Sequence, residues 1–424
     1  MDLFEYQHGS LHAEGVRVSE IAAQLGTPCY VYSQATILQH YHTVQQAFAP
    51  VSPLICCSIK ANSSLAILDV LRCQGAGFDV VSGGELFRAL KIGTEPQTIV
   101  FAGVGKTLAE IEQALTADIL LFDVESEPEL LAIDAAAQRL GRRARVALRI
   151  NPNVDAHTHA RITTGKAENK FGIDRDTALA LYRRRGELKA TDMSGVHMHI
   201  GSQITEVEPY VEALHVALSF IEDCRRIGAK MEYLNMGGGF GIHYREREGK
   251  LLDEFAERLV PLLQRSRCRI ILEPGRFIFG SGGILLTRVL YVKKTPAKTF
   301  VIVDAAMNDL MRPMLYDAFH HIAPTELAPG QRDPRGTADD PALPVVDVVG
   351  GVCESTDVLA RARHLPPVKA GELMAIFTAG AYGFSMSSTY NSRPQLPEAL
   401  VDGPRWRLIR ERQSYEDLVV KERL

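Results

Sequence analysis

The chain has 424 residues, of which 46% are hydrophobic and 23% charged, and its formal net charge at pH 7 is −4. This composition is ordinary for a globular protein, and the small negative charge gives no electrostatic reason to expect nucleic-acid binding. The length is too great for one ordinary hydrophobic core, so we expect two domains.

The cysteines and the N-terminus indicate the cellular compartment. The seven cysteines are an odd, scattered set without zinc-site spacing. They do not suggest a disulfide framework, and a reducing cytoplasm fits them best. The N-terminal stretch MDLFEYQHGSLH is acidic and polar, unlike a signal peptide. No apolar stretch is long enough to span a bilayer, so we expect a cytoplasmic protein.

From residue 54 onward, short apolar runs alternate with amphipathic stretches. The runs are rich in Val, Ile and Leu and mostly lack polar alternation, which is typical of strands buried on both faces. We expect strands at Leu54–Ile59, Phe78–Val81, Thr98–Ala102, Ile119–Phe122, Arg145–Ile150, Met193–His199, Tyr233–Met236 and Arg269–Leu272.

The stretches between these runs predict helices. Several have apolar residues at helical spacing and stop at a glycine, which readily adopts the left-handed conformation that ends a helix. These helices are expected at Ser64–Gln74, Glu85–Ile92, Ser126–Leu140 and Pro209–Ile227. Eight βα units in about 220–250 residues indicate a closed parallel (β/α)8 barrel of the TIM type, with a doubly wound open sheet as the alternative.

The pattern changes after Glu273. Strand-like runs continue without regular helices between them, which predicts a mostly antiparallel β domain. These runs are Gly283–Val292, Thr299–Val303, Val345–Val349 and Leu373–Phe377. The proline- and glycine-rich stretch Pro324–Pro344 is expected to be a long loop.

We therefore expect three parts. The barrel occupies residues 34–280, and the β domain occupies residues 281–424. An N-terminal segment, residues 1–33, precedes the barrel pattern and packs with the β domain.

Lys60 follows the first predicted strand. It comes directly after the apolar run LICCSI and is followed by polar residues. A buried lysine loses solvation, which makes its neutral amine more available as a nucleophile for imine formation. Taken alone, Lys60 is more simply a lysine that leaves a core strand for solvent.

Other polar residues also lie where predicted strands end, as active-site groups of such barrels do. Asp79 lies in the second run, His197 and His199 end the sixth, Gly237–Gly239 follow the seventh, and Glu273–Arg276 follow the eighth. Each has a plain structural alternative: a tight turn for the glycines, a helix cap or ion pair for the carboxylates, and simple hydrogen bonding for the histidines. Their convergence on one rim favours a shared site.

Pyridoxal 5′-phosphate needs such a set of groups. It requires an amine for its aldehyde, an anion site for its phosphate, an acid for its pyridine nitrogen and a flat face for stacking. Glycines after a late barrel strand let backbone N–H groups approach a phosphate. The sequence therefore predicts a pyridoxal-phosphate site at the barrel mouth, and no metal site.

Segments along nearly the whole chain resemble the barrel-type (fold type III) pyridoxal-phosphate-dependent decarboxylases. They are SIKANSSL (58–65), TGKAENKFGID (164–174), HMHIGSQ (197–203), GGGFGI (237–242), EPGR (273–276), VDAAMNDLMRPMLY (303–316), CESTD (353–357) and GAYGFSMSSTYNSRP (380–394). Among the departures, Ser58 and Ile59 stand where alanine and valine are usual, and His157–Ile162 differs from the usual approach to its motif.

The resemblance implies roles for the matching residues. Lys60 would form the imine with the cofactor, His199 would stack on the ring, and Glu273 would contact the pyridine nitrogen. The implied cofactor-binding set is completed by Asp79, Ser202, Gly238, Gly239, Gly275, Arg276 and Tyr382.

The resemblance also implies a substrate site and a homodimer. Arg276, Arg312 and Tyr316 would hold the distal carboxylate of the substrate, Glu354 its distal amine, and Tyr382 would also contact it. Cys353 would donate the proton that replaces the departing carboxylate. Cys353 and Glu354 would enter the site from the partner subunit.

The implied reaction is decarboxylation of meso-2,6-diaminopimelate at its D-centre to L-lysine, the last step of lysine biosynthesis. Two arginines suit a carboxylate and disfavour a substrate with a bare ammonium end. The alternatives are a related decarboxylase of ornithine, lysine, arginine or carboxynorspermidine, a racemase, and a non-catalytic pyridoxal-phosphate carrier. Glu273 argues against the racemase, and the β domain argues against the carrier.

Overall fold

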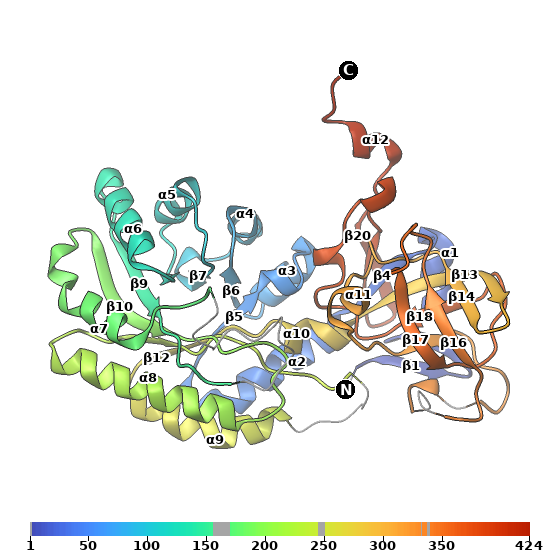
Figure 1. Ribbon diagram of the computed structural model, residues 1–424, viewed down its shortest axis with the longest axis horizontal. Helices are drawn as coiled ribbons and strands as arrows, with labels where there is room; N and C mark the ends of the chain where they lie inside the picture. Colours follow the sequence, from blue (N-terminus) through green and yellow to red (C-terminus); the bar gives the residue numbers. More distant parts are fainter. Residues whose placement is uncertain (1, 156–169, 245–250, 332, 337–339) are drawn as a thin grey trace. The chain divides into compact units, whose positions relative to one another are not determined.

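Figure 1 shows the computed structural model of the protein, which describes residues 2–155, 170–244, 251–331, 333–336 and 340–424. The chain forms two compact units. We call Tyr41–Ile242 with Lys250–Phe277 the barrel unit, and Met1–His40 with His243–Gly249 and Ile278–Leu424 the β unit. The segment 157–162 and the first part of TGKAENKFGID lie outside the described residues.

The barrel unit contains a closed barrel of eight parallel strands. This confirms the predicted (β/α)8 fold and excludes the doubly wound sheet. The strands are β5 (Leu54–Ser58), β6 (Gly77–Val80), β7 (Ile99–Phe101), β8 (Leu121–Val124), β9 (Ala144–Arg149), β10 (Thr191–His197), β11 (Tyr233–Asn235) and β12 (Arg269–Leu272). Each predicted strand is present, with bounds shifted by at most two residues.

Helices surround the barrel strands (Figure 1). After α2 (Gln34–Ala47), they are α3 (Leu65–Arg72), α4 (Gly83–Lys91), α5 (Leu108–Ala117), α6 (Glu127–Leu140), α7 (Arg175–Arg183), α8 (Glu208–Arg226) and α9 (Leu251–Ser266). The four predicted helices correspond to α3, α4, α6 and α8. The glycines that follow them, Gly75, Gly93, Gly141 and Gly228, have φ values of +86°, +77°, +61° and +78°, as their proposed role in ending helices requires.

The inside of the barrel changes from apolar to polar along the strands. Side chains two residues apart on a strand point in the same direction, so they form successive layers. One layer is a buried apolar cluster that includes Cys56, Leu121, Ala147, Tyr233 and Ile271. Two residues further along the same strands, toward their C-terminal ends, stand Ser58, Asp123, Arg149, Asn235 and Glu273. The polar layer therefore lies at the mouth of the barrel.

The β unit is built on a mixed, mostly antiparallel sheet, as predicted. Its strand order is β17-β16-β14-β13-β4-β19-β20, and β18 pairs with β13 and β15. The strands are β4 (Cys29–Ser33), β13 (Gly283–Lys294), β14 (Thr299–Val303), β15 (Ile322–Pro324), β16 (Val345–Val349), β17 (Val358–His364), β18 (Leu373–Ile376), β19 (Glu398–Asp402) and β20 (Arg405–Arg410). Strand β4, from the N-terminal part of the chain, pairs with β13 and β19.

Smaller elements complete the fold. A three-stranded antiparallel sheet near the N-terminus comprises β1 (Phe4–Gln7), β2 (Ser10–Ala13) and β3 (Val16–Arg17). The remaining helices are α1 (Val18–Leu25), α10 (Arg276–Phe279), α11 (Arg312–Tyr316) and α12 (Tyr415–Val419). The described part of the predicted loop Pro324–Pro344 contains, beyond the end of β15, an isolated β-bridge between Glu326 and Ser10 and a 3-10 turn at Pro334–Gly336.

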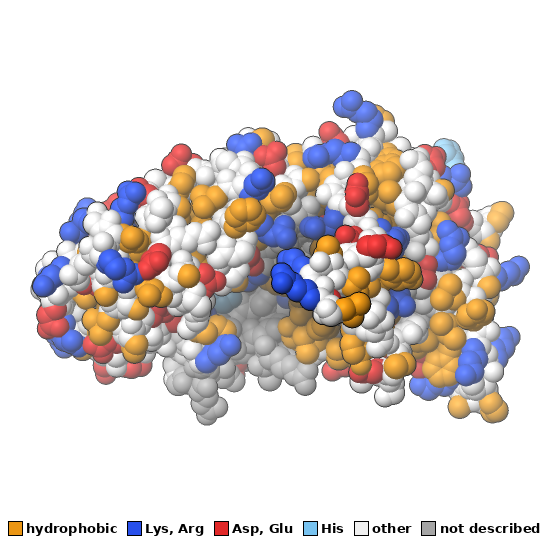
Figure 2. Space-filling view, turned by 90° about the horizontal axis from the view of Figure 1, so that it is seen from above, with side chains coloured by type: hydrophobic (Ala, Val, Ile, Leu, Met, Phe, Trp, Pro, Cys, Tyr) orange, Lys and Arg blue, Asp and Glu red, His pale blue; other side chains and the backbone are white. Residues whose placement is uncertain are grey.

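The surface carries both signs of charge. On the face shown in Figure 2, basic and acidic side chains are interspersed with hydrophobic ones. This pattern agrees with the small net charge of the chain. Among the described helices, none combines the length and the apolar character that crossing a membrane requires.

Candidate active site at the mouth of the barrel

Lys60 lies in a short 3-10 turn, Ile59–Ala61, that directly follows β5. Its Nζ is 2.6 Å from Oδ2 of Asp79, which is fully buried on the neighbouring strand β6. Burial raises the pKa of Asp79 above its ordinary value, although the Lys60 ammonium and the Ser58 hydroxyl oppose this shift. The lysine amine is therefore held at the barrel mouth by a carboxylate.

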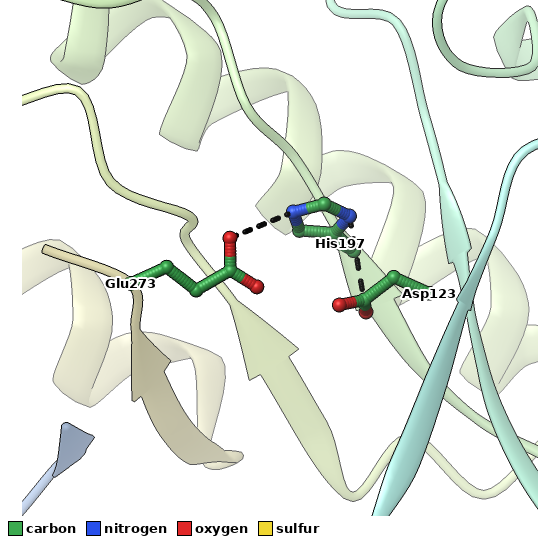
Figure 3. Close-up of side chains that lie close together, drawn as sticks. All are labelled: Asp123, His197 and Glu273. Atoms are coloured by element: carbon green, nitrogen blue, oxygen red, sulfur yellow. Dashed lines mark ion pairs between the residues drawn. The ribbon is translucent and has the colours of Figure 1, made fainter. Parts of the chain in front are cut away.

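Glu273, one residue after β12, belongs to a buried polar network, in which His197 lies between Glu273 and Asp123 (Figure 3). Nδ2 of Asn235 lies 2.6 Å from its Oε1 and 3.0 Å from Oδ2 of Asp123. Nε2 of His197 lies 3.6 Å from Oε2 of Glu273, and Nδ1 of the same ring lies 3.8 Å from Oδ1 of Asp123. Burial would raise the pKa of Glu273, but His197 and Lys60 outweigh it and hold this pKa well below its usual range.

His199 follows β10 and presents a neutral imidazole. Its Nδ1 accepts a hydrogen bond from the backbone N–H of Gly238 at 3.2 Å, so this nitrogen carries no proton. Burial, with the positive charges of Arg149 and Lys60, lowers the pKa of His199 well below its ordinary value. A neutral ring at a fixed angle is suited to stacking on a flat cofactor.

The glycine turn after β11 packs too closely for side chains. A Cβ on Gly238 would lie 2.0 Å from the backbone oxygen of Glu273, and one on Gly239 would lie 2.4 Å from the backbone oxygen of Gly201. Gly239 also has a φ of +101°. These positions require glycine, and the absence of side chains lets the backbone of the turn approach its neighbours closely, as a phosphate-binding turn also requires.

Arg276 and Ser202 lie beside this turn. Nη2 of Arg276 donates to Oγ of Ser202 at 3.1 Å, and the arginine is 8% exposed. Gly275, which precedes Arg276, is buried. The structure thus brings together nine predicted residues at the mouth of the barrel unit: Lys60, Asp79, His199, Ser202, Gly238, Gly239, Glu273, Gly275 and Arg276.

The other predicted site residues belong to the β unit. Arg312 begins α11 and is 5% exposed; its Nη1 donates to Nε2 of His320 at 2.8 Å. Nδ1 of His320 then carries the proton and donates to the backbone oxygen of Phe377 at 2.9 Å. The guanidinium lies 4.7 Å from the ring centroid of Tyr244. Contacts on both sides therefore fix the orientation of Arg312.

Two more of the predicted residues, Cys353 and Glu354, are exposed. The hydroxyl of Tyr390 donates to Glu354, and this hydrogen bond lowers the pKa of the glutamate. Tyr316 ends α11, and Tyr382 lies in a loop with a φ of +56°, which is unusual for a tyrosine.

Sequence reasoning missed three members of the network around Glu273. Asp123 and Asn235 were not considered, and His197 was noted only as a strand-end residue. The signal was available: Asp123 and Asn235 each lie two residues beyond an apolar residue of the barrel interior, Leu121 and Tyr233, and His197 is the last residue of β10. The rule that selected Asp79, a polar residue near the end of a buried strand, also selects them.

Asp123, His197 and Glu273 are close enough together to be considered as metal ligands. The two nitrogens of His197 face different carboxylates, however, as Figure 3 shows. A single ion can bind only one nitrogen of an imidazole, so it could not lie between both pairs. We interpret this cluster as an ion-pair network.

The barrel matches a known family. A family model described as "Pyridoxal-dependent decarboxylase, pyridoxal binding domain" matches residues 34–280. The fold and the barrel mouth therefore place this protein in the class of pyridoxal-dependent barrel decarboxylases.

Full-length relatives narrow the class. The chain is 43% identical to diaminopimelate decarboxylase of Aquifex aeolicus, over 98% of this chain and 96% of that protein. It is 44% identical to diaminopimelate decarboxylase of Vibrio cholerae, over 99% of this chain and 98% of that protein. The crystal structure of the Helicobacter pylori diaminopimelate decarboxylase complexed with L-lysine superposes with a TM-score of 0.89, at 42% identity, and the match covers 96% of this chain and 99% of that one. The chain belongs to the diaminopimelate decarboxylase family.

Proposed function

We propose that this protein decarboxylates meso-2,6-diaminopimelate at its D-centre and forms L-lysine and carbon dioxide, with pyridoxal 5′-phosphate as cofactor. The observation that carries this proposal is the barrel mouth, where the Lys60 amine is paired with Asp79 and the Glu273 carboxylate is buried. Relatives that carry this activity in their names match almost the whole chain.

The residues at the barrel mouth fit the cofactor. Lys60 offers an amine, and Glu273 offers a carboxylate whose depressed pKa keeps it an acceptor for a protonated pyridine nitrogen. His199 offers a neutral ring for stacking. The turn at Gly238 and Gly239, which has no room for side chains, would bind the phosphate together with Gly275, Arg276 and Ser202.

When bound, pyridoxal phosphate supplies an aldehyde and an electron-withdrawing ring that stabilises negative charge on the carbon losing carbon dioxide. Lys60 would hold the cofactor through its Nζ, and Asp79 would orient that amine. Glu273 would keep the proton on the pyridine nitrogen. Cys353 would donate the proton that takes the place of the lost carboxylate.

We assign substrate selection to the residues that suit the distal carboxylate and distal amine of diaminopimelate. Arg312, held by His320 and Tyr244, and Arg276 would bind the distal carboxylate with Tyr316. Glu354 would bind the distal amine, and Tyr382 would contact both substrate and cofactor. Ornithine and lysine have no distal carboxylate that these arginines could bind, so the arginines do not suit them as substrates.

Turnover with separate amino acids tests the assignment. Purified enzyme is supplied with meso-diaminopimelate, ornithine or lysine, and carbon dioxide and product are measured for the wild type and Lys60→Ala. We expect lysine and carbon dioxide from diaminopimelate only, and none from the variant. Turnover of ornithine but not diaminopimelate would contradict the substrate, and cofactor binding without any turnover would indicate a carrier.

We also propose that the enzyme is a homodimer in which Cys353 and Glu354 enter the site of the partner subunit. Their exposure supports this role, because an exposed thiol and carboxylate are available to a second chain. Mixing Lys60→Ala with Cys353→Ala chains tests it. Random pairing gives one intact site in half of the dimers, so activity should recover to about a quarter of the wild-type value. No recovery in demonstrated mixed dimers would refute the shared site.

We place the enzyme in the cytoplasm. All seven cysteines are free thiols, and Cys73 and Cys353 are exposed. Exposed free thiols suit a reducing compartment. Fractionation of the source cells, followed by immunodetection, would test this location.

A further inference from the structure

Two side chains, Asn235 and His197, bridge the same pair of buried carboxylates. Asn235 contacts one oxygen of Asp123 and one of Glu273, at 3.0 and 2.6 Å. His197 faces the other oxygen of each carboxylate, at 3.8 and 3.6 Å (Figure 3). All four residues are at most 3% exposed, so water does not separate these charges.

This geometry favours a charged His197, because both ring nitrogens face carboxylate oxygens at ion-pair distances, although neither contact is short enough to be a hydrogen bond. The amide of Asn235 has two protons and can donate to both carboxylates, but it carries no charge. A neutral imidazole has a proton on one nitrogen only and would turn a lone pair toward the other carboxylate. Only the doubly protonated ring presents an N–H to both Asp123 and Glu273, and its positive charge compensates the buried Glu273 carboxylate.

We propose that His197 is a positioning residue that stays positively charged between Asp123 and Glu273 and thereby keeps Glu273 in its carboxylate form. The proposal rests on the proposed function insofar as Glu273 faces the pyridine nitrogen of the cofactor. A carboxylate there accepts a hydrogen bond and keeps the ring nitrogen protonated. A protonated Glu273 would instead donate, and the ring would lose its positive charge and much of its capacity to accept electrons.

The charges around His197 support this assignment. Asp123 faces it from β8 and Glu273 from the end of β12, while Arg149 on β9 opposes its charge. The effect of Arg149 is reduced because its guanidinium is paired with the buried Glu125. Burial disfavours the charged imidazole, but the two carboxylates outweigh burial and raise the pKa of His197.

More distant groups act on the carboxylates. Asp79, on β6, raises the pKa of Asp123, and Lys60 lowers that of Glu273. Burial raises the pKa of Asp123 well above its ordinary value, although His197 opposes this rise. The pKa of Glu273, in contrast, is lowered. A proton that enters the network should therefore reach Asp123 before Glu273.

Substitutions at three positions separate a charge effect from a packing effect. His197→Gln keeps one donor and removes the charge. Asp123→Asn, added to His197→Gln, removes the carboxylate that the charge compensates. Tyr182→Phe is the control: its hydroxyl is buried and donates to the backbone oxygen of Gly195 on the same strand β10 at 2.6 Å, but it carries no charge.

The first measurement uses the apoenzyme and depends on neither cofactor nor substrate. Ring nitrogens of 15N-labelled histidine are observed from about pH 6 to 8.5, and the His197 signals are assigned by their loss in His197→Gln. We expect imidazolium shifts at both nitrogens across this range. A neutral ring at pH 7 would overturn the proposal, whatever the substrate of the enzyme is.

The second measurement follows the cofactor absorption band and kcat against pH in the loaded enzyme. The wild type and Tyr182→Phe should have no acid limb between about pH 6 and 8.5, whereas His197→Gln should acquire one, with kcat falling about tenfold per pH unit. Adding Asp123→Asn should move this limb to lower pH by about one unit or more. A uniform loss of kcat in His197→Gln with an unchanged pH profile would indicate a packing role and refute the proposal.

Discussion

Ser58→Ala removes a single hydroxyl that acts on the Lys60–Asp79 pair. Oγ of Ser58 is 2.7 Å from Oδ2 of Asp79 and 3.1 Å from the backbone oxygen of Glu273, and the residue is 2% exposed. A hydroxyl has one proton to donate. The shorter of the two contacts is to the carboxylate oxygen of Asp79, so Ser58 donates its proton there. Loss of a hydrogen bond to an ionised group costs about 1.5–3 kcal/mol, and to a neutral group about 0.5–1.5 kcal/mol.

The cost should therefore depend on pH. Burial raises the pKa of Asp79, and the Ser58 hydroxyl lowers it, so the hydroxyl stabilises the carboxylate form. In Ser58→Ala the pKa of Asp79 rises further. The variant should lose about 1.5–3 kcal/mol of unfolding free energy near pH 8, and less as the pH falls through the raised pKa of Asp79, because the protonated carboxyl is the form less affected by the loss.

Urea unfolding of the apoprotein measures this difference. Far-UV circular dichroism is preferred, because the single tryptophan, Trp406, lies in the β unit and does not report on the barrel. Ser194→Ala is the matched control: Ser194 is a fully buried serine on β10 whose Oγ has no hydrogen-bond partner among the described residues. A destabilisation by Ser58→Ala that is equal at every pH, or larger at acid pH, would refute the reasoning.

Three further substitutions test other parts of the site. Gly238→Ala forces a Cβ to within 2.0 Å of the backbone oxygen of Glu273. We expect a loss of about 1–3 kcal/mol of unfolding free energy, measured by thermal unfolding, and weaker cofactor binding, measured by titration. Gly105→Ala, where a Cβ meets nothing within 4 Å, should change neither. Arg312→Lys should raise KM for diaminopimelate about tenfold or more, since a lysine cannot bind a carboxylate through two N–H groups; an unchanged KM would contradict this role. Cys353→Ser should lower kcat by about 100-fold if the thiol donates the final proton, and steady-state kinetics with normal kcat would exclude it as the donor.

Much of the barrel could be predicted from the sequence. Strands buried on both faces leave uninterrupted apolar runs, and glycines end helices at recognisable places, so each barrel strand and four of the surrounding helices were predicted. The helices α5, α7 and α9 were missed because α5 and α7 are followed by Asp118 and Arg184 rather than by a glycine, and α9 contains Pro261. In the β unit, β17 and β20 were missed because arginines interrupt their apolar residues.

The sequence by itself determined which strand ends carry reactive groups, because a lysine, an aspartate or a glutamate after a buried run is visible in one dimension. Only the tertiary structure decided which of them face one another. Asp123, His197 and Glu273 are far apart along the chain and meet because the parallel strands close into a barrel. Closure also buries them, and burial makes the charge of His197 and the hydroxyl of Ser58 matter to the carboxylates beside them.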